Sequence, residues 1–187
     1  MTFRRGFKAE ADRVARDLRG EMGLSQTDPF DPFAAAADLC IPVYAFTKVV
    51  HDSQSIEAVL LRDGRVSAMT IFTARNRRAI FYNENRVRAR VVSDISHEIA
   101  HALLFHPAHS VSDLGCAGID RSAEEEAAHL AGLLLVPNEA ALHILSAGLP
   151  PEAASRLFGV SEPMMRYRIN ISGARLRHAR RQRRLAI

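Results

Sequence analysis

The stretch His97-Glu98-Ile99-Ala100-His101 decides the fold, because it fits the pattern HExxH and no other stretch of the chain does. Residues four apart on an α-helix lie on one face, so both imidazoles can reach a single ion. The glutamate between them lies near the same space and can act as a base toward a water molecule on that ion. Zinc suits two neutral histidine nitrogens, one further carboxylate and a fourth position open to water. The motif therefore predicts the site of a zinc metallopeptidase.

The residues around the motif predict an amphipathic helix whose apolar stripe is bordered by the two histidines. A match with three fixed positions also occurs by chance, and histidines four apart can form an ordinary polar face. Histidines and a glutamate beside a core face are costly unless something binds them, which favours the metal site. His106, close to Pro107, is interpreted as a partner of the helix dipole. The stripe consists of Val91, Ile95, Ile99, Ala102 and Leu103.

A second helix is expected to supply the third ligand from a later segment. Ser122, followed three residues later by Glu125, resembles a capping box that opens this helix, and Pro137 marks its end. The glutamates in its first turn could simply offset the helix dipole. Glu124 shares a side with Ala127 and borders the buried surface, whereas Glu125 lies on a more exposed side. We therefore expect Glu124 to be the third ligand, with Glu125 as the alternative.

The segments HEIAHALLFH at 97–106 and EEEAAHLAGLLLVP at 124–137 resemble the ImmA/IrrE zinc metallopeptidases, a gluzincin-like family. Aligning the second segment with the family form places the family's metal-binding glutamate on Glu124. The family usually has Asn or Asp where this chain has Ala128, and a polar group there would steady a ligand histidine. We expect Asp94 or His129 to substitute for it.

The residues together predict a mechanism as well as a zinc site. His97, His101 and Glu124 would hold the ion, and Glu98 would be the catalytic base. His129 and Tyr82 are the candidates for stabilising the oxyanion. The resemblance implies that the protein substrate is a helix-turn-helix transcriptional repressor, cleaved in response to stress.

Composition predicts one soluble domain, since 48% of the 187 residues are hydrophobic and 25% are charged. No apolar run approaches the roughly 20 residues that cross a bilayer, so no membrane partner is expected. Residues 1–6 are followed by no apolar stretch, which argues against a secretory signal. Cys40 and Cys116 stand apart from each other, so two free thiols and a cytoplasmic location are predicted.

The remaining patterns predict an α+β fold in which a small antiparallel sheet packs on helices. A hairpin is expected at Asp63-Gly64, and Asp31-Pro32 is typical of a helix start. The predicted helices are 7–20 and 33–39, and the predicted strands are 41–46, 56–61, 65–72 and 79–83.

The chain is predicted to divide into a peptidase-like domain at 1–149 and a basic segment at 150–187, packed on the same domain. Two short helices across Gly159, with Ser161 as the N-cap of the second, resemble a helix-turn-helix. Eight arginines and no acid follow from Arg166 onward, although the whole chain has a net charge of only +4. DNA binding through this segment is one interpretation, and packing on the domain with a solvated tail is the other.

Two functions of different classes follow from these patterns. The first is a zinc-dependent endopeptidase that cleaves a regulatory protein. The alternative is a non-proteolytic transcriptional regulator, stabilised by zinc, that binds DNA or a repressor partner.

Overall fold

The computed structural model describes residues 3–50, 67–72, 77–106 and 120–185, and its main chain forms two compact units. The mixed unit is Asp31–Ala128, and the helical unit combines Met1–Phe30 with His129–Ile187. The boundary predicted between residues 149 and 150 does not coincide with a boundary between these units, and that domain division remains a prediction. Helix α6 (Arg121–Leu135) begins in the mixed unit and ends in the helical unit.

The mixed unit contains a small sheet in the strand order β1-β3-β2. Strand β2 pairs with β3 in antiparallel register, but β1 pairs with β3 in parallel. The predicted wholly antiparallel sheet is therefore wrong for β1. A short hairpin can join only antiparallel strands, and the prediction assumed such connections. Because β2 lies between β1 and β3 along the chain, their connection is long enough to allow parallel pairing. The elements are α2 (Pro32–Asp38), β1 (Val43–Ala45), α3 (Thr47–Val50), β2 (Ala68–Phe72), β3 (Arg78–Tyr82) and α5 (Arg88–Leu103).

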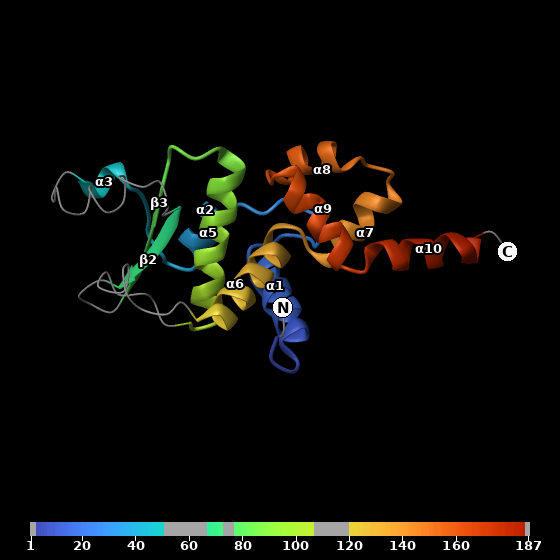
Figure 1. Cartoon of the computed structure of the whole chain (residues 1–187), viewed down its shortest axis with the longest axis horizontal. Coiled ribbons are helices and arrows are strands. Elements are labelled where there is room, and N and C mark those ends of the chain that lie inside the picture. Colours follow the sequence, from blue (N-terminus) through green and yellow to red (C-terminus); the bar gives the residue numbers. More distant parts are fainter. Residues whose placement is uncertain (1–2, 51–66, 73–76, 107–119, 186–187) are drawn as a thin grey trace. The chain divides into compact units, whose positions relative to one another are not determined.

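Helix α5 packs against β2 and β3, as Figure 1 shows. Most of its predicted apolar stripe is buried, with Ile95 and Ile99 fully enclosed, whereas Ala102 and Leu103 at its end are only partly buried. Ile80 of β3 is also fully buried. The start of α2 also agrees with the sequence, because the Asp31 side chain accepts a hydrogen bond from the backbone N–H of Phe33. An α+β architecture is therefore confirmed. The predicted strand 56–61 and hairpin at Asp63-Gly64 lie outside the described residues.

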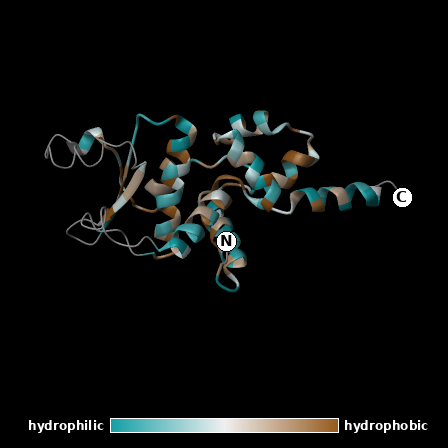
Figure 2. Ribbon diagram, in the orientation of Figure 1, coloured by the Kyte–Doolittle hydropathy of each residue, from teal (hydrophilic) through white to brown (hydrophobic). Residues whose placement is uncertain are grey.

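The helical unit begins with α1, the helix predicted at 7–20, in which Phe7, Ala11 and Leu18 are buried on one face. Helix α7 is largely hydrophobic (Figure 2) and packs along α10. No single helix in the described part of the chain is both long and apolar enough to cross a membrane. The elements wholly within this unit are α1 (Phe7–Glu21), α7 (Asn138–Ser146), α8 (Pro151–Phe158), α9 (Glu162–Ile171) and α10 (Ala174–Leu185).

Helices α8 and α9 form as the sequence predicts. Gly159 adopts a left-handed conformation (φ 65°) between them, and the Ser161 side chain accepts a hydrogen bond from the backbone N–H of Met164. Arg166 pairs with Glu162, whereas Arg168 is buried and donates from Nε to the carbonyl oxygen of Val136. The helix pair is thus observed, but its similarity to a DNA-binding helix-turn-helix is not confirmed.

The cysteines are only partly described. Cys40 is an exposed free thiol, and Cys116 lies outside the described residues. Cys40 also follows α2 in a left-handed conformation, with φ of 55°.

Candidate metal centre

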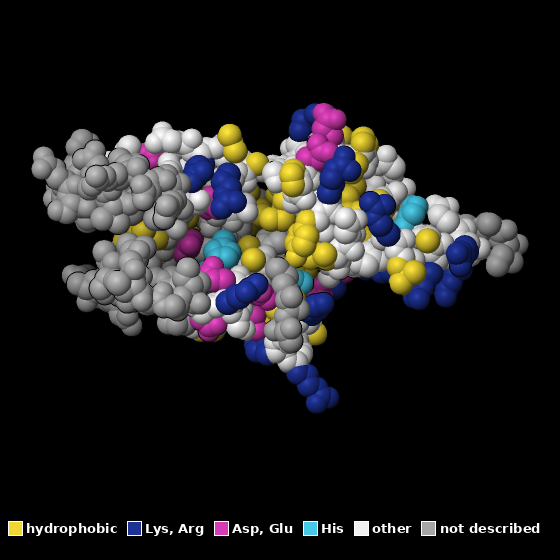
Figure 3. Space-filling view, in the orientation of Figure 1, with side chains coloured by type: hydrophobic (Ala, Val, Ile, Leu, Met, Phe, Trp, Pro, Cys, Tyr) yellow, Lys and Arg dark blue, Asp and Glu magenta, His cyan; other side chains and the backbone are white. Residues whose placement is uncertain are grey.

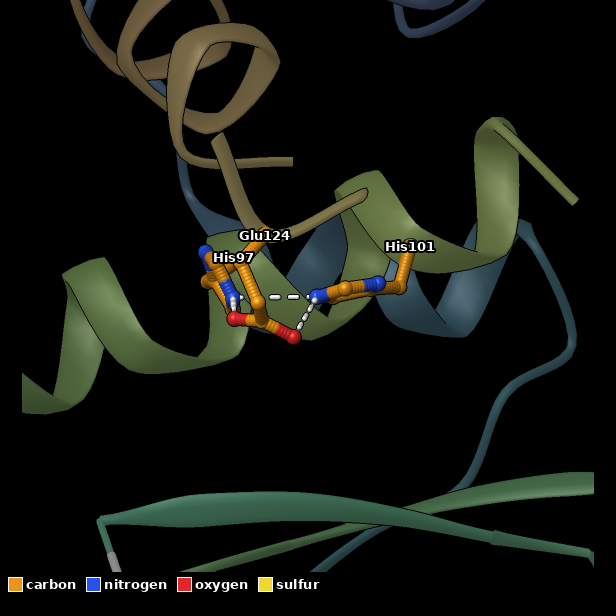
Figure 4. Close-up of side chains that lie close together, drawn as sticks. All are labelled: His97, His101 and Glu124. Carbon is orange, nitrogen blue, oxygen red and sulfur yellow. Dashed lines mark hydrogen bonds and ion pairs between the residues drawn. The ribbon is translucent and has the colours of Figure 1, made fainter. Parts of the chain in front are cut away.

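Helix α5 places His97 and His101 one turn apart, with their Nε2 atoms 3.0 Å from each other. Glu124, from the first turn of α6, reaches both rings. Its Oε2 lies 3.0 Å from His97 Nε2 and its Oε1 lies 3.3 Å from His101 Nε2. Figure 4 shows the carboxylate meeting the two imidazoles, and histidine and acidic side chains lie side by side on this face in Figure 3. The structure therefore brings the three predicted ligand residues together.

The start of α6 determines which glutamate arrives at the histidines. The predicted capping box at Ser122 is wrong, because Asp120 is the cap: its Oδ1 accepts from the backbone N–H of Ser122 at 2.9 Å. Glu124 then points to the histidines, while Glu125 pairs with Arg121 at 3.3 Å. Of the two glutamates that the sequence left open, the geometry favours Glu124.

The donor set fits a metal ion. One ligand atom from each of His97, His101 and Glu124 lies within 4.8 Å of the others. Two nitrogens at the usual Zn–N distance of about 2.05 Å lie about 3.3 Å apart in a tetrahedral site, close to the observed 3.0 Å. Hydrogen bonds from His101 and His97 hold the pKa of Glu124 below its ordinary value, so this carboxylate is ionised at neutral pH. Two imidazoles and one carboxylate, with a fourth position left open, are a ligand set typical of catalytic zinc sites.

Glu98 lies between the histidines in sequence but has a different partner. The Thr70 hydroxyl, from β2, donates to Glu98 Oε2 at 2.6 Å, and Thr70 is buried. The guanidinium of Arg78 is near enough for the charge of Glu98 to raise its pKa, although burial lowers the pKa of Arg78 overall. Sequence reasoning missed Thr70. The sequence shows only that Thr70 lies in a predicted strand that precedes the motif helix. That position does not indicate a hydrogen bond with Glu98.

His106 is the second residue that sequence reasoning missed. Its Nδ1 lies 3.0 Å from His101 Nδ1, and its Nε2 lies 3.8 Å from Glu126 Oε2. Burial is the main cause that lowers the pKa of His106. The interpretation as a dipole partner placed His106 at the end of the helix but did not predict that its ring folds back. That fold requires the left-handed conformation of Phe105, which the sequence pattern does not indicate.

The other predicted site residues have different surroundings. Asp94 pairs with Arg90 at 3.0 Å, and burial raises the pKa of Asp94. Tyr82 packs edge-on against the ring of Phe33. Within the helical unit, the His129 ring packs on Phe3 and Phe7, and burial lowers the pKa of His129 to about 4.

These contacts give Asp94, His129 and Tyr82 structural partners but do not test their predicted functional roles.

The comparison with known families gives one match. The family model Peptidase_M78, described as the IrrE N-terminal-like domain, matches residues 69–170. This range includes His97, Glu98, His101 and Glu124, together with β3 and most of α9. No curated protein matches the chain.

Proposed function

Because the chain belongs to the Peptidase_M78 family, with its IrrE N-terminal-like domain, we propose that it is a zinc-dependent endopeptidase. The family supports a metallopeptidase type of function acting on a protein substrate. The convergence of His97, His101 and Glu124 is the observation that carries the proposal. Zinc is the metal whose preferred ligands match this set.

In the proposed mechanism His97, His101 and Glu124 hold the ion. When bound, zinc polarises the scissile carbonyl and makes a water molecule acidic enough to be deprotonated near neutral pH. Glu98 takes the proton from the attacking water and passes it to the leaving amine nitrogen. The Thr70 hydroxyl donates to Oε2 of that carboxylate, which would leave its other oxygen for the proton transfer.

The finer proposal concerns the substrate. Similarity to the ImmA/IrrE proteins supports a helix-turn-helix repressor as the protein that is cleaved, in a cytoplasmic stress response. An extended segment of that repressor would lie across the site. Candidate repressors can be tested by incubation with the zinc-loaded chain and mass analysis of the fragments.

The decisive experiment compares Glu98→Gln with the zinc-loaded parent protein, using casein as a general substrate and candidate repressors as specific ones. Loss of the base is expected to lower the cleavage rate by roughly 10²–10⁴-fold while zinc content stays the same. Glu125→Gln is the matched control, because it removes a carboxylate one residue from Glu124 that pairs with Arg121. Cleavage at the parent rate by Glu98→Gln would remove Glu98 from the mechanism.

A second candidate function, DNA binding, is favoured by the charge on α10. Arg180, Arg181, Arg183 and Arg184 are exposed, and none forms a hydrogen bond or ion pair with another described residue. On α8 and α9, by contrast, Arg156 and Arg166 are each paired with a glutamate four residues earlier. Dark-blue side chains are visible along α10 in Figure 3. Four exposed arginines without partners in the described part of the chain suit the phosphates of a nucleic acid.

Salt dependence tests this second candidate. Four phosphate contacts predict that log Kobs for duplex DNA falls with log salt at a slope of about −3.6. Replacing the four arginines by glutamine should remove this slope, and the double variant Arg156→Gln, Arg166→Gln is the control. Absence of salt-sensitive binding by the full chain would reject the candidate and leave the peptidase proposal intact.

A further inference from the structure

The two nitrogens of His101 face different partners. Nε2 lies among the candidate metal ligands, 3.0 Å from His97 Nε2 and 3.3 Å from the Glu124 carboxylate. Nδ1, on the other side of the ring, lies 3.0 Å from Nδ1 of His106. The two rings stand nearly perpendicular, at 68°, with their centroids 5.0 Å apart. His106 therefore contacts the ring of His101 at the nitrogen that remains when Nε2 binds a metal.

The backbone after α5 is shaped to place His106 there. Phe105 has a left-handed conformation (φ 55°), and the backbone N–H of His106 then donates to the carbonyl of His101 at 3.0 Å. Arg78 donates from Nη2 to the carbonyl of His106, also at 3.0 Å. The Phe105 side chain is 88% exposed, so burial of its ring does not explain this unfavourable conformation. Cys40 ends α2 with the same conformation, so this is a helix-ending geometry, and after α5 it turns His106 back onto the helix.

The number of protons on the two rings determines which Nδ1 atom is the donor in the hydrogen bond between His101 and His106. Only one proton can lie between the two Nδ1 atoms. When His101 Nε2 offers its lone pair to a metal, the proton of His101 is on Nδ1 and is donated to His106. The neutral ring of His106 then carries its own proton on Nε2, which lies 3.8 Å from Glu126 Oε2. The Glu126 carboxylate is buried and favours a proton on that side of His106.

We propose that His106 and Glu126 form a positioning pair that holds His101 in the tautomer and orientation of a metal ligand. The inference rests on the proposed function, since it assumes that His101 binds the ion. His106 touches neither substrate nor metal in this arrangement and acts through His101. Partners of this kind commonly change metal affinity by 10–100-fold.

The test uses two variants of similar shape. His106→Asn keeps an acceptor oxygen close to the position of Nδ1, whereas His106→Leu has the same branching and no acceptor. Zinc affinity is measured on the full chain by competition with a chelator, and Co²⁺ absorption reports the geometry of the site. Zinc affinity should be about 10–100-fold lower than that of the parent in the Leu variant. In the Asn variant it should be close to that of the parent. The control His143→Leu removes an exposed histidine of the helical unit and should leave zinc affinity unchanged.

Glu126→Gln gives an independent measurement, because it removes the charge that faces His106 Nε2 and keeps the size of the side chain. A loss of zinc affinity of several-fold is expected, with a Co²⁺ spectrum that shifts in the same direction as that of His106→Leu. Equal zinc affinities for the parent, His106→Leu and Glu126→Gln proteins would overturn the positioning pair. Failure of the parent protein to bind zinc or Co²⁺ would instead overturn the proposed function. If His106→Leu does not fold, Glu126→Gln against the parent still decides the matter.

Discussion

The two ends of α6 accommodate charged side chains in opposite ways. At its first turn, in the mixed unit, Glu124 faces two imidazole nitrogens, so three possible metal ligands converge on one point. At its last turn, in the helical unit, the buried guanidinium groups of Arg19 and Arg168 donate to the carbonyls of Leu134 and Val136. Arg19 also donates to the carbonyls of Ser25 and Asp28. Cations at a helix C-terminus are stabilised by its free carbonyls.

The difference separates a structural role from a binding role. The arginines find complementary acceptors within the protein, in the carbonyl oxygens of Leu134 and Val136. The cluster of His97, His101 and Glu124 consists mainly of acceptors when the imidazoles are neutral, so a cation is its natural complement. We therefore expect mutations at the first end of α6 to affect metal binding, and mutations at the last end to affect stability.

The largest expected effect is that of Glu124→Ala on zinc binding. Each of the three protein ligands contributes part of the free energy with which zinc binds. With the binding free energy typical of structural zinc sites, loss of one ligand should weaken zinc binding by roughly 10²–10³-fold. The urea midpoint of the zinc-free protein should fall by a smaller factor, because the Glu124 side chain, although hydrogen-bonded to both histidines, is one-third exposed. Chelator competition and urea unfolding measure the two quantities. Glu125→Ala is the control and should keep the zinc affinity of the parent. Unchanged zinc affinity in Glu124→Ala would contradict the metal-binding role of the first end of α6.

Arg168→Met should have the reverse profile. It leaves the carbonyl of Val136 and the side-chain oxygen of Asn138 without their donors, at a cost of about 2–3 kcal/mol in the free energy of unfolding. Zinc affinity should be retained. Urea unfolding measures the loss, and Arg166→Met is the control, since exposed ion pairs such as Arg166–Glu162 contribute about 0.5 kcal/mol or less. Zinc affinity that falls together with stability would show that the two ends are coupled.

A smaller effect is expected from acid on His129. Burial lowers its pKa to about 4, whereas the unfolded chain has an ordinary value of 6.5. Between these values the unfolded state binds more protons, so stability contributed by the neutral ring is lost as the pH falls from 6.5 to 4. His129→Phe keeps the contact with Phe3 and Phe7 and should remove this pH dependence, which amounts to at most about 3 kcal/mol. Parallel stability curves for both proteins across this range would contradict the assignment.

The smallest effect is expected for Phe105→Gly. Glycine adopts positive φ freely, and the exposed ring contributes little packing, so a gain of about 0.5–1 kcal/mol in the free energy of unfolding is expected. Zinc affinity should be unchanged, because the backbone that places His106 is kept. Thermal unfolding of the zinc-free protein measures the gain. A destabilised variant would mean that Phe105 has contacts that its 88% exposure does not suggest.

Local patterns in the sequence were sufficient to predict the helices around the site. The apolar stripe of α5 and the cap at Asp31 depend on neighbouring residues in the chain, and both are observed. The choice of Glu124 over Glu125 also followed from helix periodicity, because the two side chains point about 100° apart. The same kind of pattern misplaced the cap of α6 at Ser122, since Asp120, two residues earlier, offers an equivalent side chain.

Contacts between distant segments could not be predicted in this way. The parallel pairing of β1 with β3 depends on the path of the intervening chain, and the bond from Thr70 to Glu98 depends on how α5 lies on β2. The burial of Arg168 against Val136 joins residues that are 32 positions apart. None of these has a periodic signal, because periodicity describes one element and not the surface it meets.

The sequence by itself determined that two imidazoles would share one face of α5, since the helical repeat fixes that spacing, and that a glutamate would stand in the first turn of a later helix. Only the tertiary structure decided which groups surround them. Thr70 reached Glu98 and His106 reached His101 because the sheet packs on α5 and the chain reverses at Phe105. Hydrogen bonds act over about 3 Å, so their partners are set by the placement of whole elements rather than by the order of residues.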